Sequence, residues 1–197
     1  MTDVVDLVQR HKLIISIYII DETVKKSFSV NVTSTVLEFH ALIAEKLGLS
    51  EEGNRLFSIC EVVDDDYGEP IDRWLDYQKT FGDQYITKKS YLCFKLKYLK
   101  HIAPNLINEK EEEMIHRQFL NLALKNYYPC SEKKAVDIAS YVLQIQFGDY
   151  NKRKHRVGYL NKIGLNPYLP STVSHHDSAY WQRRLFLKHK TRRGIPK

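Results

Sequence analysis

The chain has 197 residues, of which 43% are apolar and 12% aromatic, and its formal net charge is +6. This composition excludes a largely disordered chain, and the length allows one large domain or two small ones that each bury a core. No apolar run approaches a membrane span, and the acidic start, with Asp3 and Asp6, lacks the lysines of a signal peptide. These features predict a soluble, cytoplasmic protein.

Positive charge is concentrated in the last quarter of the chain. From Asp149 onward the chain contains twelve Lys and Arg residues but only two aspartates, so the net charge of this part is about +10. The net charge of everything before it is about −4. Such an uneven field attracts an acidic partner, which can be phospholipid headgroups, nucleic acid or an acidic protein surface.

The chain begins with the pattern of a hairpin followed by a helix. Residues 12–21 are rich in β-branched and aromatic residues and predict a strand, and the alternation of residues 28–32 predicts its partner. Thr33 or Ser34 is then expected to cap a helix whose apolar residues, from Val36 to Leu47, share one face.

Three further strands are predicted before residue 100. They are residues 56–63, residues 71–75 and residues 91–99, and an acidic turn separates the first two. The order of strands around a single helix is that of a ubiquitin-like β-grasp lobe, in which the helix packs on one face of a mixed sheet.

The second half of the chain has helical patterns only. An acidic run at residues 109–113 favours a helix start, and a last helix is expected from about Asp177 to Arg193. Between them, Ser131 caps a helix that ends at Gly148. Its apolar residues at helical spacing are Ala135, Ile138, Ala139, Val142 and Ile145. We therefore predict an α+β fold with a domain boundary near residue 100, giving domains 1–100 and 101–197.

The sequence offers no set of catalytic residues. No Ser/His/Asp or Cys/His set has a known catalytic spacing, and Gly148 and Gly158 do not form a phosphate-binding loop. Cys60, Cys93 and Cys130 are widely spaced in apolar surroundings, which is typical of reduced core thiols. We expect a protein that is not an enzyme and has no cofactor.

Two polar clusters superficially resemble metal sites. Residues 64–66, DDD, with Glu69 lack the spacing of a calcium loop and predict a polar hairpin turn. His175 and His176 are adjacent on a loop, where neighbouring side chains seldom point at one ion, and Asp177 is better used as a helix cap. We therefore predict no metal site.

Several stretches resemble the first two lobes of a FERM domain, the module named after band four-point-one, ezrin, radixin and moesin. Residues 128–160, YPCSEKKAVDIASYVLQIQFGDYNKRKHRVGYL, are similar to the connector, helix and Gly-Asp-Tyr-Asn segment of its second lobe. Residues 180–184, YWQRR, and 189–194, HKTRRG, resemble its tryptophan-to-His-Arg-Gly helix. Residues 73–76, RWLD, followed by Lys79 and a strand to Tyr98, resemble the end of its ubiquitin-like lobe. The resemblance implies that the helical lobe is similar to acyl-CoA-binding protein.

Two departures from the family pattern affect the expected function. A complete FERM domain continues into a third lobe, so the resemblance implies a further lobe downstream of Lys197. Phosphoinositide-binding members carry a lysine after the Trp-Leu pair and two more shortly afterwards. This chain has Asp76 in the first place and Thr80 in the last, which leaves Lys79 as the first-lobe lipid contact.

The resemblance implies a non-enzymatic adaptor at the plasma membrane or cell cortex. It would link the cytoplasmic tails of membrane proteins, or anionic phospholipid, to the cytoskeleton or to signalling partners. In some family members the face formed by the two lobes binds a Rap-type small GTPase, which is a second hypothesis. The fold of the helical lobe leaves an acyl-CoA-binding module as a third.

The candidate binding residues are the basic side chains of the last quarter, each of which would contribute about 1 kcal/mol near an anionic bilayer. They are Lys152, Arg153, Lys154, Arg156, Lys162, Arg183, Arg184, Arg192 and Arg193. The alternative is a solvated surface that keeps the domain soluble. Nucleic acid, with Tyr150 and Tyr159 as stacking faces, is not favoured because the chain has no nucleic-acid-binding motif.

Overall fold

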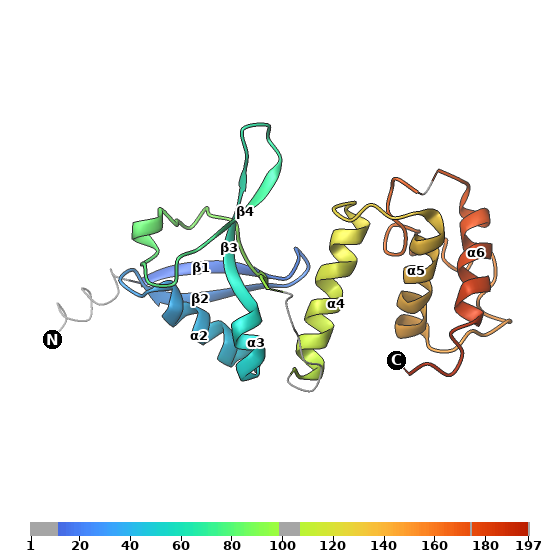
Figure 1. The fold of residues 1–197 in the computed structure, drawn as a ribbon, viewed down its shortest axis with the longest axis horizontal. Coiled ribbons are helices and arrows are strands. Elements are labelled where there is room, and N and C mark those ends of the chain that lie inside the picture. Colours follow the sequence, from blue (N-terminus) through green and yellow to red (C-terminus); the bar gives the residue numbers. More distant parts are fainter. Residues whose placement is uncertain (1–11, 99–106, 174, 197) are drawn as a thin grey trace. The chain divides into compact units, whose positions relative to one another are not determined.

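The computed structural model describes residues 12–98, 107–173 and 175–196. The chain divides into two compact units, Met1–Gln118 and Phe119–Lys197, which we call the strand-rich unit and the helical unit. Figure 1 shows the order of their elements. The division falls inside helix α4 (Glu109–Leu124), whose side chains as far as Arg117 and Gln118 form hydrogen bonds within the strand-rich unit. The predicted boundary near residue 100 remains a prediction.

The strand-rich unit contains a five-stranded mixed sheet in the order β2-β1-β5-β3-β4. Its strands are β1 (Lys12–Ile19), β2 (Lys25–Asn31), β3 (Phe57–Asp64), β4 (Pro70–Trp74) and β5 (Leu92–Leu96). Strands β1 and β5 are parallel, and the other neighbouring pairs are antiparallel. A parallel pair at the centre of otherwise antiparallel strands confirms the predicted β-grasp lobe.

Helix α2 (Val36–Leu47) packs on the sheet (Figure 1), where its side chains contact β2 and β3. Its cap is Thr35, whose side chain accepts a hydrogen bond from the Glu38 amide, while the Glu38 carboxylate accepts one from the Thr35 amide. The expectation of Thr33 or Ser34 was wrong, because only Thr35 has a glutamate three residues later to complete a capping box. Phe39 is fully buried, and its ring lies edge-on to Phe28 at 5.3 Å between centroids.

Two short elements complete this unit. Helix α3 (Glu51–Leu56) begins at Ser50, whose hydroxyl accepts a hydrogen bond from the Gly53 amide, and η1 (Gly82–Gln84) is a single 3-10 turn. The Glu111 side chain of α4 is fully buried, and its carboxylate accepts hydrogen bonds from the Ser50 amide and hydroxyl. The acidic start of α4 therefore also fixes α3 in place.

The helical unit is built on α5 (Glu132–Phe147) and α6 (Ser178–Lys190), capped as predicted by Ser131 and Asp177. Trp181 of α6 has no exposed surface. The core contains Ala135, Val136, Ala139, Leu143, Leu160, Tyr168, Leu169, Val173, Trp181, Leu185 and Phe186. The α+β fold class and the order of the two lobes are confirmed.

The core face of α5 differs in part from the predicted one. Ala135 and Ala139 are buried, but Ile138 is 40% exposed and Ile145 is 47% exposed. The buried face instead runs through Leu143 and includes the polar Ser140 and Gln144.

Two further features concern membrane spans and cysteines. Among the described residues, no helix is long and apolar enough to cross a membrane. The Cys60 and Cys93 side chains are buried and that of Cys130 is half-buried, and burial raises the pKa of the Cys60 thiol.

Candidate functional site

The basic loop, residues 149–163, begins where α5 ends and folds around one buried histidine. His155 is only 3% exposed, and its Nδ1 atom accepts a hydrogen bond from the Asn151 amide at 3.0 Å. The His155 amide in turn donates to the Asn151 carbonyl at 2.8 Å. Burial lowers the pKa of His155, with smaller contributions from His189 and Lys154, so its imidazole is neutral at physiological pH. The run KRKHR therefore contains an internal anchor.

Aromatic rings enclose this anchor. The His155 ring is stacked on Phe186 of α6, with 5.8 Å between the centroids and 16° between the planes. The other rings in contact with it are Phe147, Tyr150, Tyr159 and His189. The Tyr150 and Tyr159 rings thus both pack against His155, which gives each ring a structural role within the protein.

A second buried histidine ties the ends of α5 and α6 together. The Nε2 atom of His189 lies 2.8 Å from the Gly148 carbonyl and 3.2 Å from Oε1 of Gln144. The Gln144 side chain donates to Asp149 Oδ1 at 2.9 Å and to the Ile195 carbonyl at 2.7 Å. Gly148 and Asp149 belong to the Gly-Asp-Tyr-Asn motif and His189 to the His-Lys-Thr-Arg-Arg-Gly motif, so both motifs have a structural role at the start of the basic loop.

The loop presents its cations to solvent. Lys152, Arg153, Lys154 and Arg156 are all exposed, and among the described residues none of them forms an ion pair. Val157 and Ile163 are 44% and 43% exposed on the same loop. The sequence did not indicate their exposure, because a single apolar residue between a cation and a glycine can equally belong to the core.

Three more of the predicted cations are exposed in the helical unit, one in the loop itself and two outside it. Gln182 of α6 accepts hydrogen bonds from the Gly158 amide at 2.9 Å and the Leu160 amide at 3.2 Å, which holds the loop along this helix. Arg183, the next residue, is exposed, and so are Lys162 and Arg193.

Two predicted cations are used inside the helical unit. The Arg184 guanidinium lies 3.1 Å from Glu132 Oε2. Arg192 is ion-paired with Asp137, donates to the Ser140 hydroxyl at 3.0 Å and lies 3.8 Å above the Tyr141 ring. Since these contacts join α6 and the segment that follows it to α5, both arginines stabilise the packing of the helical unit.

Lys79, the first-lobe candidate, is exposed but has a partner. Its ammonium lies 3.8 Å from the Asp76 carboxylate, the residue that replaces a lysine of the family pattern. An exposed pair of this kind has a small energy, yet it reduces the local positive charge. The structure brings no other predicted site residue to Lys79 within the strand-rich unit.

Hydrogen bonds within the acidic turn between β3 and β4 hold its conformation. The carboxylate of Asp65 accepts hydrogen bonds from the amides of Tyr67 and Glu69. Asp65 thus acts as an internal acceptor in a hairpin turn, which agrees with the sequence interpretation.

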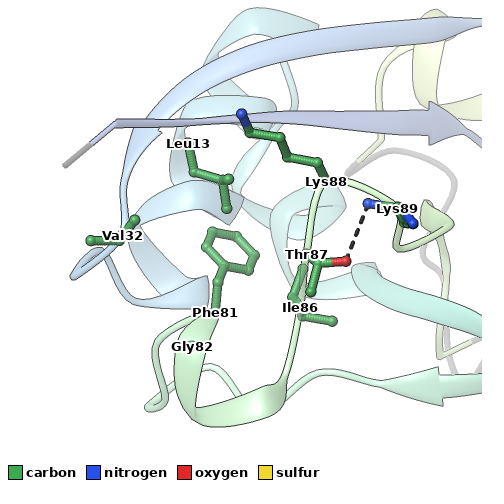
Figure 2. A pocket seen from close by; sticks show the side chains of 8 residues that line it. All are labelled: Leu13, Val32, Phe81, Gly82, Ile86, Thr87, Lys88 and Lys89. Atoms are coloured by element: carbon green, nitrogen blue, oxygen red, sulfur yellow. Dashed lines mark hydrogen bonds between the residues drawn. The ribbon is translucent and has the colours of Figure 1, made fainter. Parts of the chain in front are cut away.

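A separate apolar groove of about 550 Å³ lies in the strand-rich unit (Figure 2). Leu13, Val32, Phe81 and Ile86 provide its apolar lining. Lys88 and Lys89 follow Ile86 at the rim, where Thr87 Oγ1 accepts a hydrogen bond from the Lys89 amide. The sequence did not indicate this groove, because its walls come from three separate segments.

Comparison with known proteins identifies this architecture. The model of the FERM central domain matches residues 102–197. FERM domain-containing protein C of Dictyostelium discoideum is 31% identical over 179 residues, which are 90% of this chain and 12% of that protein. These findings confirm the resemblance to a FERM domain that the sequence motifs indicated.

Solved structures show the same fold. The FERM and C-terminal domain complex of Drosophila Merlin matches with a TM-score of 0.76 and 19% identity, covering 93% of this chain and 60% of that one. The MyTH4-FERM domain of human Myosin 7b, solved with the harmonin-a PDZ3 domain, matches with a TM-score of 0.65 and 18% identity, covering 98% and 41%. This chain thus spans only part of each of these relatives.

Proposed function

We propose that this chain is an adaptor module that attaches to anionic membrane surfaces through the basic loop of its helical unit and also binds a protein partner. One observation carries the proposal: Lys152, Arg153, Lys154 and Arg156 are exposed and lack ion pairs within the described chain, on a loop fixed by buried His155. A rigid loop loses little conformational entropy on binding. No catalytic step is involved.

The chemistry of the loop suits a bilayer surface. Each cation near anionic lipid contributes about 1 kcal/mol, and exposed apolar side chains such as Val157 and Ile163 can enter the headgroup region. The two Merlin and Myosin 7b structures contain FERM domains in complex with protein domains, which supports a protein partner for this chain as well.

Vesicle binding tests the membrane half of the proposal. Reversing Lys152, Arg153, Lys154 and Arg156 to Glu should weaken sedimentation with phosphatidylserine vesicles at least about tenfold. The matched control reverses Lys88, Lys89, Lys133 and Lys134, which are also exposed, and so changes net charge by the same amount. Equal losses in both variants would show a nonspecific charge effect and contradict the proposal.

The groove of the strand-rich unit supports binding of a protein segment. Its apolar lining, with Lys88 and Lys89 at the rim, suits an apolar side chain flanked by carboxylates. Two synthetic peptides test this preference for carboxylates. They share one apolar core, and one has acidic flanks while the other has basic flanks. The acidic peptide should bind more tightly, and the K88E/K89E variant should reverse the preference. Equal binding of both peptides would contradict it.

The Rap-type GTPase partner remains an alternative proposal. It predicts that the chain recovers the GTP-loaded form in preference to the GDP-loaded form. Equal recovery of the two forms would dispose of it.

A further inference from the structure

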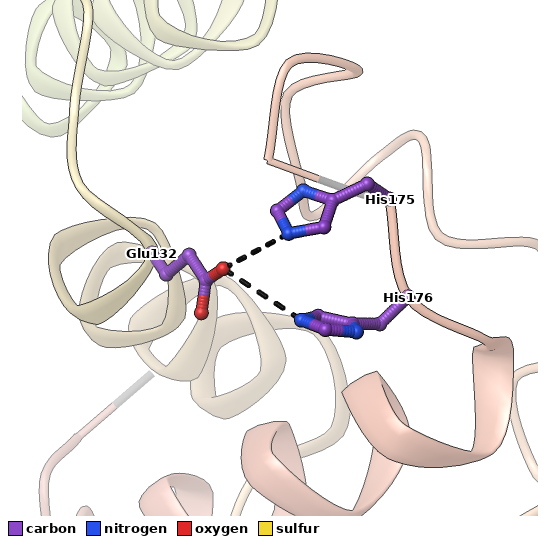
Figure 3. Close-up of side chains that lie close together, drawn as sticks. All are labelled: Glu132, His175 and His176. Atoms are coloured by element: carbon purple, nitrogen blue, oxygen red, sulfur yellow. Dashed lines mark ion pairs between the residues drawn. The ribbon is translucent and has the colours of Figure 1, made fainter.

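Three metal-ligating side chains of the helical unit converge on one point (Figure 3). Glu132 is the first residue of α5, and His175 and His176 lie just before Asp177, the cap of α6. The Nε2 atoms of the two histidines lie 3.3 Å and 3.9 Å from the same oxygen, Oε1 of Glu132. Figure 3 shows both imidazole rings directed at this carboxylate.

These separations are those of ligands around a single ion. Bonds of about 2.0–2.1 Å to a tetrahedral Zn²⁺ place neighbouring ligand atoms about 3.4 Å apart. The two measured His-to-Glu distances are close to this value, and all three ligand atoms lie within 4.8 Å of one another. Small side-chain rotations would therefore complete three corners of a tetrahedron.

Ion pairing alone does not account for the arrangement. The separation of 3.9 Å between His176 Nε2 and Glu132 Oε1 exceeds hydrogen-bonding distance, so this ring is aimed at an oxygen to which it does not bond. The other carboxylate oxygen is already held by Arg184 at 3.1 Å. Oε1 is thus left facing the two imidazoles.

Neighbouring aromatic rings restrict the two histidine side chains, while the space between the three ligand atoms stays accessible to solvent. The His176 ring lies 4.2 Å from the Tyr180 ring and 5.8 Å from the Trp181 ring, which limits its rotation. The side chains of His175 and His176 are 59% and 43% exposed, so an ion can enter from solvent and keep a water as its fourth ligand.

We propose that Glu132, His175 and His176 form a zinc-binding site that joins the segment before α6 to the start of α5. Two imidazoles and one carboxylate with an open fourth position are a ligand set typical of Zn²⁺, whereas Ca²⁺ and Mg²⁺ require oxygen ligands. The sequence interpretation missed the site because Glu132 comes from a distant part of the chain.

Zinc titration of the whole chain against a chromophoric chelator tests the site. The protein should bind one Zn²⁺, and His175→Ala or His176→Ala should each weaken binding at least about tenfold. Co²⁺ should give the intense visible absorption of a tetrahedral complex in the unaltered chain and lose it in both variants.

Two controls distinguish other zinc ligands. His116 is an exposed histidine of α4, and Cys130 is a half-buried thiol near Glu132 in sequence. His116→Ala and Cys130→Ser should leave zinc affinity unchanged. Absence of zinc binding, full binding by both the His175 and His176 variants, or loss of binding in either control would overturn the site.

Discussion

Glu111 shows how one buried side chain can hold two segments of the strand-rich unit. Its carboxylate accepts hydrogen bonds from the Ser50 amide, the Ser50 hydroxyl and the Asn108 amide. Gly53 makes room for it, since a Cβ atom at this position would collide with the Glu111 carboxylate. The start of α4 and the start of α3 are therefore linked through one buried acid.

Gly53→Ala tests this link. The added methyl group should displace the Glu111 carboxylate, leave buried hydrogen-bonding groups unpaired, and lower the free energy of unfolding by about 1–3 kcal/mol. Gly82→Ala is the matched control, because its Cβ atom would meet only Thr80 Oγ1 at 3.8 Å. Urea denaturation of both variants measures the difference, and equal effects would contradict the link.

Arg192 makes a comparable link in the helical unit. Arg192→Ala removes its contacts with Asp137, Ser140 and Tyr141 and should cost about 1–3 kcal/mol. Arg193→Ala, at an exposed neighbouring position, should change stability by less than about 0.5 kcal/mol. Equal stability of the two variants in urea would show that Arg192 is a surface charge.

The face of α5 decides which of its apolar residues support the fold. Leu143 is fully buried, whereas Ile145 is 47% exposed. Leu143→Ala should therefore cost about 2–5 kcal/mol through a core cavity, and Ile145→Ala less than about 1 kcal/mol. Thermal unfolding of both variants measures the two losses of stability. A larger loss for Ile145→Ala than for Leu143→Ala would contradict the buried face seen in the structure and support the one predicted from the sequence.

Sequence patterns predicted the long elements well and the polar core poorly. Ser131, Gly148 and Asp177 act as predicted because capping depends on local backbone geometry. The α5 face was misjudged because Ser140 and Gln144 are buried through bonds to Arg192 and Ile195, which lie far away in sequence. Helix α3 was missed because it is only six residues long and contains Gly53.

The candidate site shows the same limit. Local charge pattern identified Lys152, Arg153 and Lys154 as surface cations, and the structure exposes all three. The charge pattern could not distinguish Arg192, which is ion-paired with a residue of α5, from the exposed cations. It also could not show that His155, inside the basic run, is buried. Long-range partners decide both cases.

At the scale of the whole molecule, the three histidines that are buried among the described residues make the free energy of unfolding depend on pH. Burial lowers the pKa of His40, His155 and His189 below their ordinary value of 6.5. As the pH falls below this value, the unfolded chain takes up protons before the folded chain does, so the free energy of unfolding should decrease. Asp137 and Asp149 accept hydrogen bonds from Lys188 and Gln144, which lower the pKa of each carboxyl below its ordinary value of 3.8. Both carboxylates therefore stabilise the folded chain above pH 3.8 and lose this contribution only as the pH falls further, outside the range in which the histidines titrate.

Thermal unfolding between about pH 7.5 and pH 5, with a chelator present, measures this dependence. The melting temperature should fall steadily over this range, and His189→Gln should reduce the slope. A melting temperature that stays constant over the range would show that these imidazoles are not kept neutral by the fold.

We propose above all that the basic loop is the surface of this protein that binds the membrane. An environment-sensitive fluorophore at Val157→Cys, in a Cys130→Ser background, reports on this directly, with Tyr85→Cys, 88% exposed in the strand-rich unit, as the second position. On addition of phosphatidylserine vesicles, the emission should shift to the blue at position 157 and stay unchanged at position 85. A shift at position 85 alone, or at neither position, would contradict the claim.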